Sequence, residues 1–222
     1  MGGGGQRTGE PEEWAVEASS DRAEATRALA GALVAVCRPG DVVLLVGGLG
    51  AGKTTFAQGF ARGLGIAGPV TSPTFTLVRE HLANGQVAGI RRLLHADLYR
   101  LGSLAEVVDL GLLEQVDEGA VALVEWGDVA APVLGDELLT IELIRPAEAG
   151  STTGEVEVGK VGVGEIEGSG AEGGVDECRT VSVRGRGSGW AARRGAVTRA
   201  LGAAAASPTA ASPAFRRRGA AT

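Results

Sequence analysis

The sequence predicts an α/β fold, a P-loop NTPase-like three-layer domain with a mixed, partly parallel sheet, extended by a disordered insertion and a disordered tail. Two stretches lead to this class. Residues 41–56, DVVLLVGGLGAGKTTF, combine a short apolar run, a glycine-rich loop and the start of a helix. Residues 119–125, GAVALVE, form a second apolar run that stops at an acidic residue, which is typical of a parallel strand beside the first.

Composition predicts one domain with additions. The chain has 222 residues, enough for a sizeable core. Its 37 glycines are well above ordinary usage, and much of this excess lies before residue 10 and after residue 150. The predicted division, in order, is a disordered N-terminus at 1–13, the P-loop domain at 14–145, a low-complexity acidic insertion at 146–177, the terminal strand and following segment of the domain at 178–202, and a disordered basic tail at 203–222.

Charge and cysteine usage narrow the functional class. The formal net charge of −6 gives no overall reason for tight nucleic-acid binding. Cys37 and Cys178 are isolated, so we expect a reducing compartment, with no disulfide framework and no cysteine metal site. No run of eighteen apolar residues and no signal-peptide core is present, so the protein is expected to be cytoplasmic, with no membrane contact.

Helical spacing of apolar residues begins after Ser19 and continues to Cys37, and Pro39-Gly40 ends this first helix. The buried strand Val42–Val46 follows, and the loop after it leads into a helix over 55–64 that closes with glycines. A helix, a turn and a central strand in this order are typical of the beginning of an α/β domain.

A hairpin is predicted next. Pro73 interrupts the segment 70–78, so its first part is a loop and residues 75–80 form a strand. Asn84-Gly85 is a turn signal, and residues 89–95 return as the partner strand. His81, beside that turn, is expected to be exposed.

The second half of the domain is predicted from three further patterns. Residues 103–113 carry apolar side chains on one face and form a helix. Residues 138–144 alternate and form a strand, expected toward the sheet edge. Residues 179–183 recover strand character after the acidic stretch, so the fold is expected to resume there for a last strand.

Residues 47–54, GGLGAGKT, fit the Walker A pattern G-x-x-x-x-G-K-[ST]. Glycines let the backbone curl so that successive N–H groups face phosphate oxygens, and the helix N-terminus adds a positive end. Lys53 is predicted to reach the β- and γ-phosphates, and Thr54 to offer its hydroxyl to Mg²⁺. A plain glycine-rich turn would give no reason for Lys-Thr at these two positions.

Two carboxylates follow strands and are candidates for organising the metal and the attacking water, Asp97 and Glu125. Glu125 is expected near Thr54 because ligands in open α/β sheets lie beyond the carboxyl ends of the strands. Either could instead be a solvated charge at a strand end. For His95 an ordinary strand-terminal role and a functional one stay equally open.

Two other features have open interpretations. Trp126 could pack beside a nucleotide or cover the sheet edge. Residues 72–74, Ser-Pro-Thr, lie where a switch segment sensing the γ-phosphate would lie, or form a plain turn.

The segments GGLGAGKTTFAQGFARGLG, VTSPTFTLV, HADLYRL and VEW, in this order and spacing, resemble the bacterial ATPase family of tRNA threonylcarbamoyladenosine biosynthesis, TsaE. The resemblance spans about residues 19–144, and RTVSVRGRGSGW at 179–190 is similar to that family's last strand and Gly-Trp ending. It implies ATP and Mg²⁺ as cofactors, slow hydrolysis alone, and productive hydrolysis with a threonylcarbamoyl transferase complex of two proteins. Contact with tRNA is then indirect, through that complex.

Carried over by motif, the resemblance implies the following site. The nucleotide is bound by Gly50, Ala51, Gly52, Lys53, Thr54, Thr55 and Trp126. Catalysis involves Lys53, Asp97 and Glu125, and the metal is held by Thr54, Asp97 and Glu125, without a decision on which carboxylate serves the metal and which the water.

The sequence departs from the family pattern at two positions. Gly48 stands where the family usually has aspartate, which removes one carboxylate near the metal or partner surface, and Gly127 stands where proline is common. Two alternatives stay open: a small-molecule kinase, although no arginine-rich lid is apparent between 103 and 136, and a nucleotide sensor that does not hydrolyse. The arginines at 216–218 either attract RNA weakly or belong to an unstructured tail.

Overall fold

The computed structural model describes residues 13–145 and 178–206. Residues 1–12 of the predicted disordered N-terminus, the predicted insertion at 146–177 and residues 207–222 of the predicted tail lie outside the described residues. The last four residues of helix α5, 203–206, were assigned to that tail and are helical instead, and Glu13 belongs to a strand.

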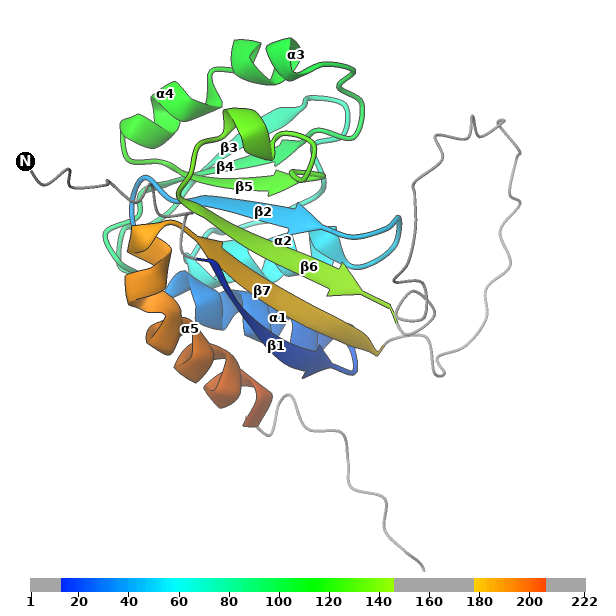
Figure 1. The fold of residues 1–222 in the computed structure, drawn as a ribbon, viewed down its shortest axis with the longest axis vertical. Helices are drawn as coiled ribbons and strands as arrows, with labels where there is room; N and C mark the ends of the chain where they lie inside the picture. Colours follow the sequence, from blue (N-terminus) through cyan, green and yellow to red (C-terminus); the bar gives the residue numbers. More distant parts are fainter. Residues whose placement is uncertain (1–12, 146–177, 207–222) are drawn as a thin grey trace, which may run out of the picture.

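One seven-stranded sheet forms the centre of the structure (Figure 1). Its strands are β1 (Glu13–Ser20), β2 (Val42–Val46), β3 (Val78–Leu82), β4 (Arg92–Asp97), β5 (Val121–Glu125), β6 (Leu138–Ile144) and β7 (Arg179–Arg186). They lie in the order β1-β7-β6-β2-β5-β4-β3. Strand β2 is parallel to β5 and β6, and β4 is parallel to β5, while the outer pairs are antiparallel. The predicted mixed, partly parallel sheet is confirmed.

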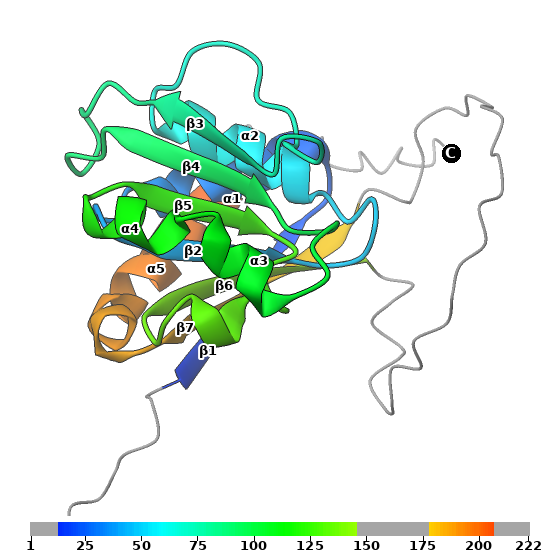
Figure 2. The same cartoon turned by 90° about the horizontal axis from the view of Figure 1, so that it is seen from above.

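Helices cover both faces of this sheet, which gives three layers (Figure 2). One face carries α1 (Ala23–Val34), α2 (Lys53–Gly63) and α5 (Ser188–Ala206); the other carries α3 (Leu104–Asp109), α4 (Leu112–Asp117) and the short 3₁₀ helix η1 (Ala131–Val133). Strand β2 shows why both faces are buried. Val43 and Leu45 pack into the first core and Val42 and Leu44 into the second, so the strand is apolar throughout.

Helix α2, which follows the phosphate loop, is held close to α1 by small residues. A Cβ at Gly59 would overlap the backbone of Arg27, and one at Gly63 would lie 2.9 Å from the carbonyl oxygen of Gly31. Side chains at these positions would push the helices apart. The glycines therefore fix the position of α2, and with it the phosphate loop, relative to the sheet.

Helix α5 is bonded to Asp41, the residue that precedes β2. Arg193 donates from Nη1 to Oδ2 of Asp41 at 2.6 Å and from Nη2 to Oδ1 at 2.9 Å, and both side chains are only 10% exposed. Its guanidinium also lies 3.6 Å from the ring centre of Trp190. This bidentate pair joins the C-terminal helix to the strand that leads into the phosphate loop.

Three elements were placed wrongly from sequence. Strand β6 is not at the sheet edge but lies between β2 and β7, because β7 and the unpredicted β1 are added outside it. The predicted helix 103–113 is two helices, broken where Gly111 adopts a φ of 63°. The hairpin strand begins at Val78 rather than 75, because the carbonyl of Pro73 accepts the amides of Thr76 and Leu77 in a turn.

Candidate functional site

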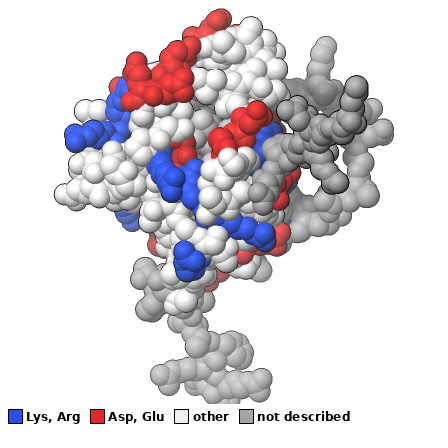
Figure 3. Space-filling view, turned by 60° about the vertical axis from the view of Figure 1, so that its left-hand side comes forward, with Lys and Arg blue, Asp and Glu red and all other residues white. Residues whose placement is uncertain are grey.

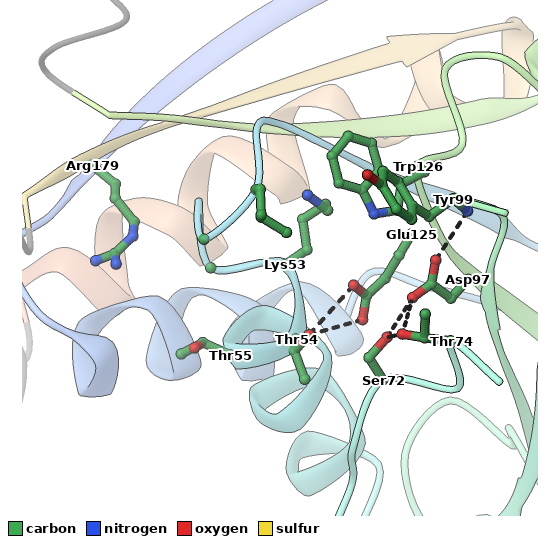
Figure 4. Close-up of a pocket in the computed structure, with 13 residues that line it drawn as sticks. Lys53, Thr54, Thr55, Ser72, Thr74, Asp97, Tyr99, Glu125, Trp126 and Arg179 are labelled. Carbon is green, nitrogen blue, oxygen red and sulfur yellow. Dashed lines mark hydrogen bonds between the residues drawn. The ribbon is translucent and has the colours of Figure 1, made fainter. Parts of the chain in front are cut away.

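A cavity of about 410 Å³ opens at the carboxyl ends of β2, β4 and β5 (Figure 4). It is lined by Leu49, Gly50, Gly52, Lys53, Thr54, Thr55, Ser72, Thr74, Asp97, Tyr99, Glu125, Trp126 and Arg179. Ligands of open α/β sheets bind at this edge, outside the carboxyl ends of parallel strands. The volume lies within the range of about 300–1,000 Å³ that small-molecule sites occupy.

The phosphate loop runs from β2 to α2. Gly47 has a φ of +139°, and a Cβ there would lie 2.5 Å from the carbonyl oxygen of Leu143, so only glycine fits. Gly50 and Gly52 are in left-handed conformations and line the cavity. Ala51 is buried, and its amide donates to the carbonyl of Gly48 at 3.2 Å, so this residue shapes the loop from within.

Lys53 is the first residue of α2 and is only 5% exposed. Its Nζ donates to the carbonyl oxygens of Gly47 and Gly48, at 2.6 and 2.9 Å, and lies 3.6 Å from the ring centre of Trp126. The ammonium group is therefore held at the inner turn of the loop by carbonyl dipoles and an aromatic face.

Thr54 and Glu125, which are 71 residues apart in sequence, meet in the cavity. The Thr54 hydroxyl donates to both carboxylate oxygens of Glu125, at 3.3 and 3.4 Å (Figure 4). Glu125 ends β5, which pairs with β2, and the parallel register brings the two together as expected. Nε2 of the fully buried His95 lies 2.9 Å from Glu125 Oε1.

The side chain of Asp97 accepts hydrogen bonds from the loop at residues 72–74, whereas Thr54 is bonded to Glu125. Its Oδ2 accepts from the hydroxyls of Ser72, at 2.5 Å, and Thr74, at 2.8 Å, and its Oδ1 accepts from the amide of Tyr99 at 3.0 Å. Figure 4 shows these groups gathered on one side of the cavity. The Ser-Pro-Thr segment is therefore attached to the site by a carboxylate and is more than a plain turn.

Trp126 lines the cavity and does not cover the sheet edge. It has a φ of 60°, which is unusual for a residue with a side chain, and its amide donates to the carbonyl of Leu45 at 2.9 Å. Its ring lies 4.9 Å from that of Tyr99, centre to centre. The next residue is Gly127, and a Cβ there would lie 2.8 Å from the side chain of Leu44. The absence of a side chain at this position therefore lets the backbone after Trp126 pass close to β2.

Sequence reasoning missed Leu49 within the phosphate loop and two lining residues outside it. Tyr99 follows Asp97 within the HADLYR segment, so its position beside that carboxylate was a usable signal. Arg179 begins β7 and donates from Nε to the carbonyl of Ala51 at 2.7 Å. The start of β7 reaches the phosphate loop only because of the order of the strands in the sheet, which no local sequence pattern indicates. Thr55 lines the cavity on the same side as Arg179 (Figure 4).

His81, expected to be exposed, is half-buried in β3, and that expectation was wrong because its ring lies 6.4 Å from the ring of His95. Burial lowers the pKa of His81 below its usual value, and the neighbouring His95 and Arg79 add to the shift. His81 does not line the cavity.

The donor groups of the cavity suit Mg²⁺. Thr54, Glu125 and Asp97 offer oxygen atoms only, which is the ligand set of a hard cation. Across residues 13–145 and 178–206 no group of three or more His, Cys, Asp or Glu side chains could hold a metal. Mg²⁺ needs no such group, because it takes one or two protein ligands together with phosphate oxygens and waters.

None of the helices in the described part of the chain is both long and apolar enough to span a membrane.

Comparison with known proteins gives one consistent result. Residues 20–153, more than half of the chain, match the family model described as "Threonylcarbamoyl adenosine biosynthesis protein TsaE". The chain is 44% identical over 125 residues to the tRNA threonylcarbamoyladenosine biosynthesis protein TsaE of Bacillus subtilis, covering 56% of this chain and 75% of that protein. It is 41% identical over 141 residues to the Streptomyces coelicolor protein of the same name, covering 63% and 91%.

A solved structure agrees with these sequence relatives. The fold superposes on the crystal structure of Bacillus subtilis YdiB with a TM-score of 0.55 and 27% identity, over 88% of this chain and 98% of that one.

Proposed function

The chain belongs to the TsaE family of threonylcarbamoyl adenosine biosynthesis proteins, and from that premise we propose that it binds ATP with Mg²⁺ in the cavity and hydrolyses ATP. Its role lies in the biosynthesis of threonylcarbamoyladenosine in tRNA. Hydrolysis is proposed to drive a threonylcarbamoyl transferase complex, and this chain does not itself transfer the threonylcarbamoyl group.

The observation that carries the proposal is the meeting of the Walker A residues with a carboxylate. Lys53 and Thr54 line a cavity of nucleotide size, and Glu125 reaches the Thr54 hydroxyl from a different strand. A structural turn would need neither a lysine at the inner face of the loop nor a carboxylate opposite the threonine. Phosphoryl transfer needs both, because it depends on positioning and on charge neutralisation.

Lys53 is proposed to neutralise the β- and γ-phosphates, exchanging its contacts with loop carbonyls for phosphate oxygens. Thr54 and Glu125 would hold Mg²⁺, with Asp97, the neighbour of Glu125 at the end of the adjacent strand β4, as a further oxygen donor. When bound, Mg²⁺ supplies charge neutralisation for the phosphate oxygens.

Asp97 and Glu125 are also the two groups able to orient the attacking water. Asp97 would do so together with the segment it binds, since Ser72 and Thr74 share its Oδ2. A phosphate that competes for these hydroxyls would shift the segment, which is the proposed nucleotide-sensitive switch. Trp126 is proposed to lie against the nucleotide.

Indirect contact with tRNA is proposed because a large part of the described chain has no basic side chains. Residues 102–144 contain no Lys or Arg, and α4 carries the exposed acids Glu114 and Asp117, followed directly by the exposed Glu118. In Figure 3, the largest group of acidic side chains lies at the top of the visible face, and below it further acidic side chains alternate with scattered basic ones. The transferase subunits would therefore hold the tRNA, in the cytoplasm, where ATP and tRNA are both present.

The test is ATP turnover by the full chain, alone and with the two transferase proteins. We expect slow turnover alone and a clear stimulation by the pair. Absence of stimulation would contradict the proposal. Nucleotide binding without turnover under both conditions would support a sensor instead, and a phosphorylated small molecule in a metabolite screen would support a kinase.

Binding is tested separately with Lys53→Ala. Losing a charge-assisted phosphate contact should weaken ATP binding by about 1.5–3 kcal/mol, roughly 10- to 150-fold in Kd. The control is Arg62→Ala, an exposed cation in the last turn of the same helix, which should leave Kd unchanged. Unaltered binding by the Lys53 variant would exclude the proposed phosphate position.

A further inference from the structure

His95 is a buried polar side chain that contacts the site without lining it. It lies in β4, beside β5, and is fully inaccessible to solvent. Its Nε2 is 2.9 Å from Oε1 of Glu125. Its other ring nitrogen, Nδ1, is buried and has no hydrogen-bond partner among the described residues. One nitrogen therefore has a specific partner and the other has none.

The hydrogen-bonding chemistry fixes the direction of this contact. An ionised carboxylate can only accept hydrogen bonds, so Nε2 of His95 carries the hydrogen and donates it to Glu125. In the neutral ring Nδ1 is then an unpaired acceptor. A buried polar atom without a partner is a free-energy cost, which an apolar side chain at this position would avoid. The histidine is therefore explained by its Nε2 contact rather than by packing.

Glu125 needs such a partner. Its carboxylate lies in the cavity beside Thr54, at distances of 3.3 and 3.4 Å, which are long for hydrogen bonds from a hydroxyl. The bond from His95 at 2.9 Å is shorter, and its donor is held rigidly within the sheet. Of the two contacts, the one from His95 is better able to fix the carboxylate.

We infer that His95 is a positioning residue for Glu125: its Nε2–H holds the carboxylate facing Thr54, so that this pair is already assembled when nucleotide and Mg²⁺ arrive. This inference rests on the proposed ATPase function. His95 does not line the cavity, so it acts through Glu125 and does not touch the nucleotide. It adds to the site a buried group of β4 that lies behind Glu125.

The main experiment compares three substitutions at this position by ATP turnover in the presence of the transferase proteins. His95→Gln places an amide N–H near the position of Nε2, His95→Asn is equally polar but too short to reach Glu125, and His95→Leu has no donor. Loss of a residue that orients a ligating group typically costs about 10- to 100-fold in activity. We expect that loss in kcat for Asn and Leu, and a smaller loss for Gln.

His81→Gln is the matched control, because His81 lies beside His95 but does not line the cavity. It should leave kcat unchanged. If the leucine variant does not fold, the Gln and Asn variants, which differ by one methylene, still decide the question. Equal kcat for Gln and Asn, or an unchanged kcat for Leu, would overturn the inference.

A second readout does not depend on turnover. Mg²⁺ should tighten ATP binding, and the ratio of Kd without and with Mg²⁺ measures this effect. His95→Asn and Glu125→Gln should each reduce the ratio, and the double variant should reduce it no further than Glu125→Gln alone, since His95 acts only through that carboxylate. Additive reductions would overturn the inference.

The tautomer gives a direct check in the nucleotide-free protein. Long-range ¹H–¹⁵N spectra should show a protonated Nε2 and an unprotonated Nδ1 for His95, and a protonated Nδ1 with a bare Nε2 would overturn the inference. The failure of the proposed function has a different signature. In that case the unsubstituted protein shows no turnover with the transferase pair, and the inference falls with it; turnover that is insensitive to His95 overturns the inference alone.

Discussion

Replacing Arg193 with methionine should remove a large part of the stability of the fold. Arg193 forms two hydrogen bonds to Asp41, at 2.6 and 2.9 Å, in a site where both side chains are 10% exposed. Methionine keeps much of the stem length but leaves the carboxylate buried without its cation. Breaking a buried pair on one side costs about 3–5 kcal/mol. Part of that carboxylate stays bonded, since the amide of Arg38 donates to it at 2.7 Å, so the lower half of the range is expected.

The assay is urea unfolding of the full chain followed by circular dichroism, with the midpoint of thermal unfolding as a second measure. For a domain of this size each kcal/mol corresponds to about 2–4 °C, so a loss of about 3–4 kcal/mol should lower the midpoint by roughly 6–16 °C. Arg194→Met is the control, because Arg194 is the exposed next residue on the same helix. It should change the midpoint little.

The double variant Arg193→Met, Asp41→Asn separates the buried charge from the loss of contacts. It removes the unpaired charge and keeps an oxygen acceptor for the amide of Arg38, so it should be more stable than Arg193→Met alone. A loss below about 1 kcal/mol in the single variant would refute the reasoning, because surface ion pairs contribute that much or less. So would a double variant less stable than the single one.

Three further outcomes are expected. Gly47→Ala should destabilise the fold more than Gly68→Ala in urea unfolding, because both residues have positive φ but only a Cβ at Gly47 meets a backbone oxygen, at 2.5 Å; equal losses would contradict the overlap. Glu125→Gln should abolish ATP turnover while ATP binding, followed by fluorescence, survives; turnover at the normal rate would exclude Glu125 from catalysis. The pKa of His81 is lowered in the folded state, so below the usual value of 6.5 the unfolded chain binds more protons than the folded one, and the free energy of unfolding should rise with pH up to that value. Relative to the unsubstituted chain, His81→Gln should therefore be more stable at pH 5 than at pH 8. A difference in free energy of unfolding that does not change with pH would contradict this.

The central part of the fold was predictable because its signals are local. The strand at Val42–Val46, the loop with its glycines and the parallel partner ending at Glu125 each have a short sequence pattern, and sheet topology brings their ends together. The approach of Glu125 to Thr54 followed from that rule alone. The additions at the sheet edge were less visible. Strand β1 alternates Trp14, Val16 and Ala18, but its weak pattern follows a glycine-rich start.

Contacts that depend on distant elements could not be predicted. Nothing in the sequence near Arg179 indicates that it binds the carbonyl of Ala51, since 128 residues separate them. The attachment of the Ser72 and Thr74 hydroxyls to Asp97 likewise depends on the turn at Pro73, whose carbonyl accepts two amides. Sequence patterns therefore predicted the types of residue in the site. The hydrogen-bond partners of these residues depend on how β4 and β7 pack beside the phosphate loop.

An exposed cysteine directly before β7 offers a natural position for a fluorescent label near the phosphate loop. The chain has two cysteines, of which Cys178 is exposed and Cys37 is buried. Burial raises the pKa of the Cys37 thiol, so its reactive thiolate is suppressed. A maleimide dye would therefore attach selectively to Cys178, whose neighbour Arg179 bonds to the loop at 2.7 Å. Nucleotide arrival could then be followed by fluorescence in the natural sequence, without any engineered cysteine.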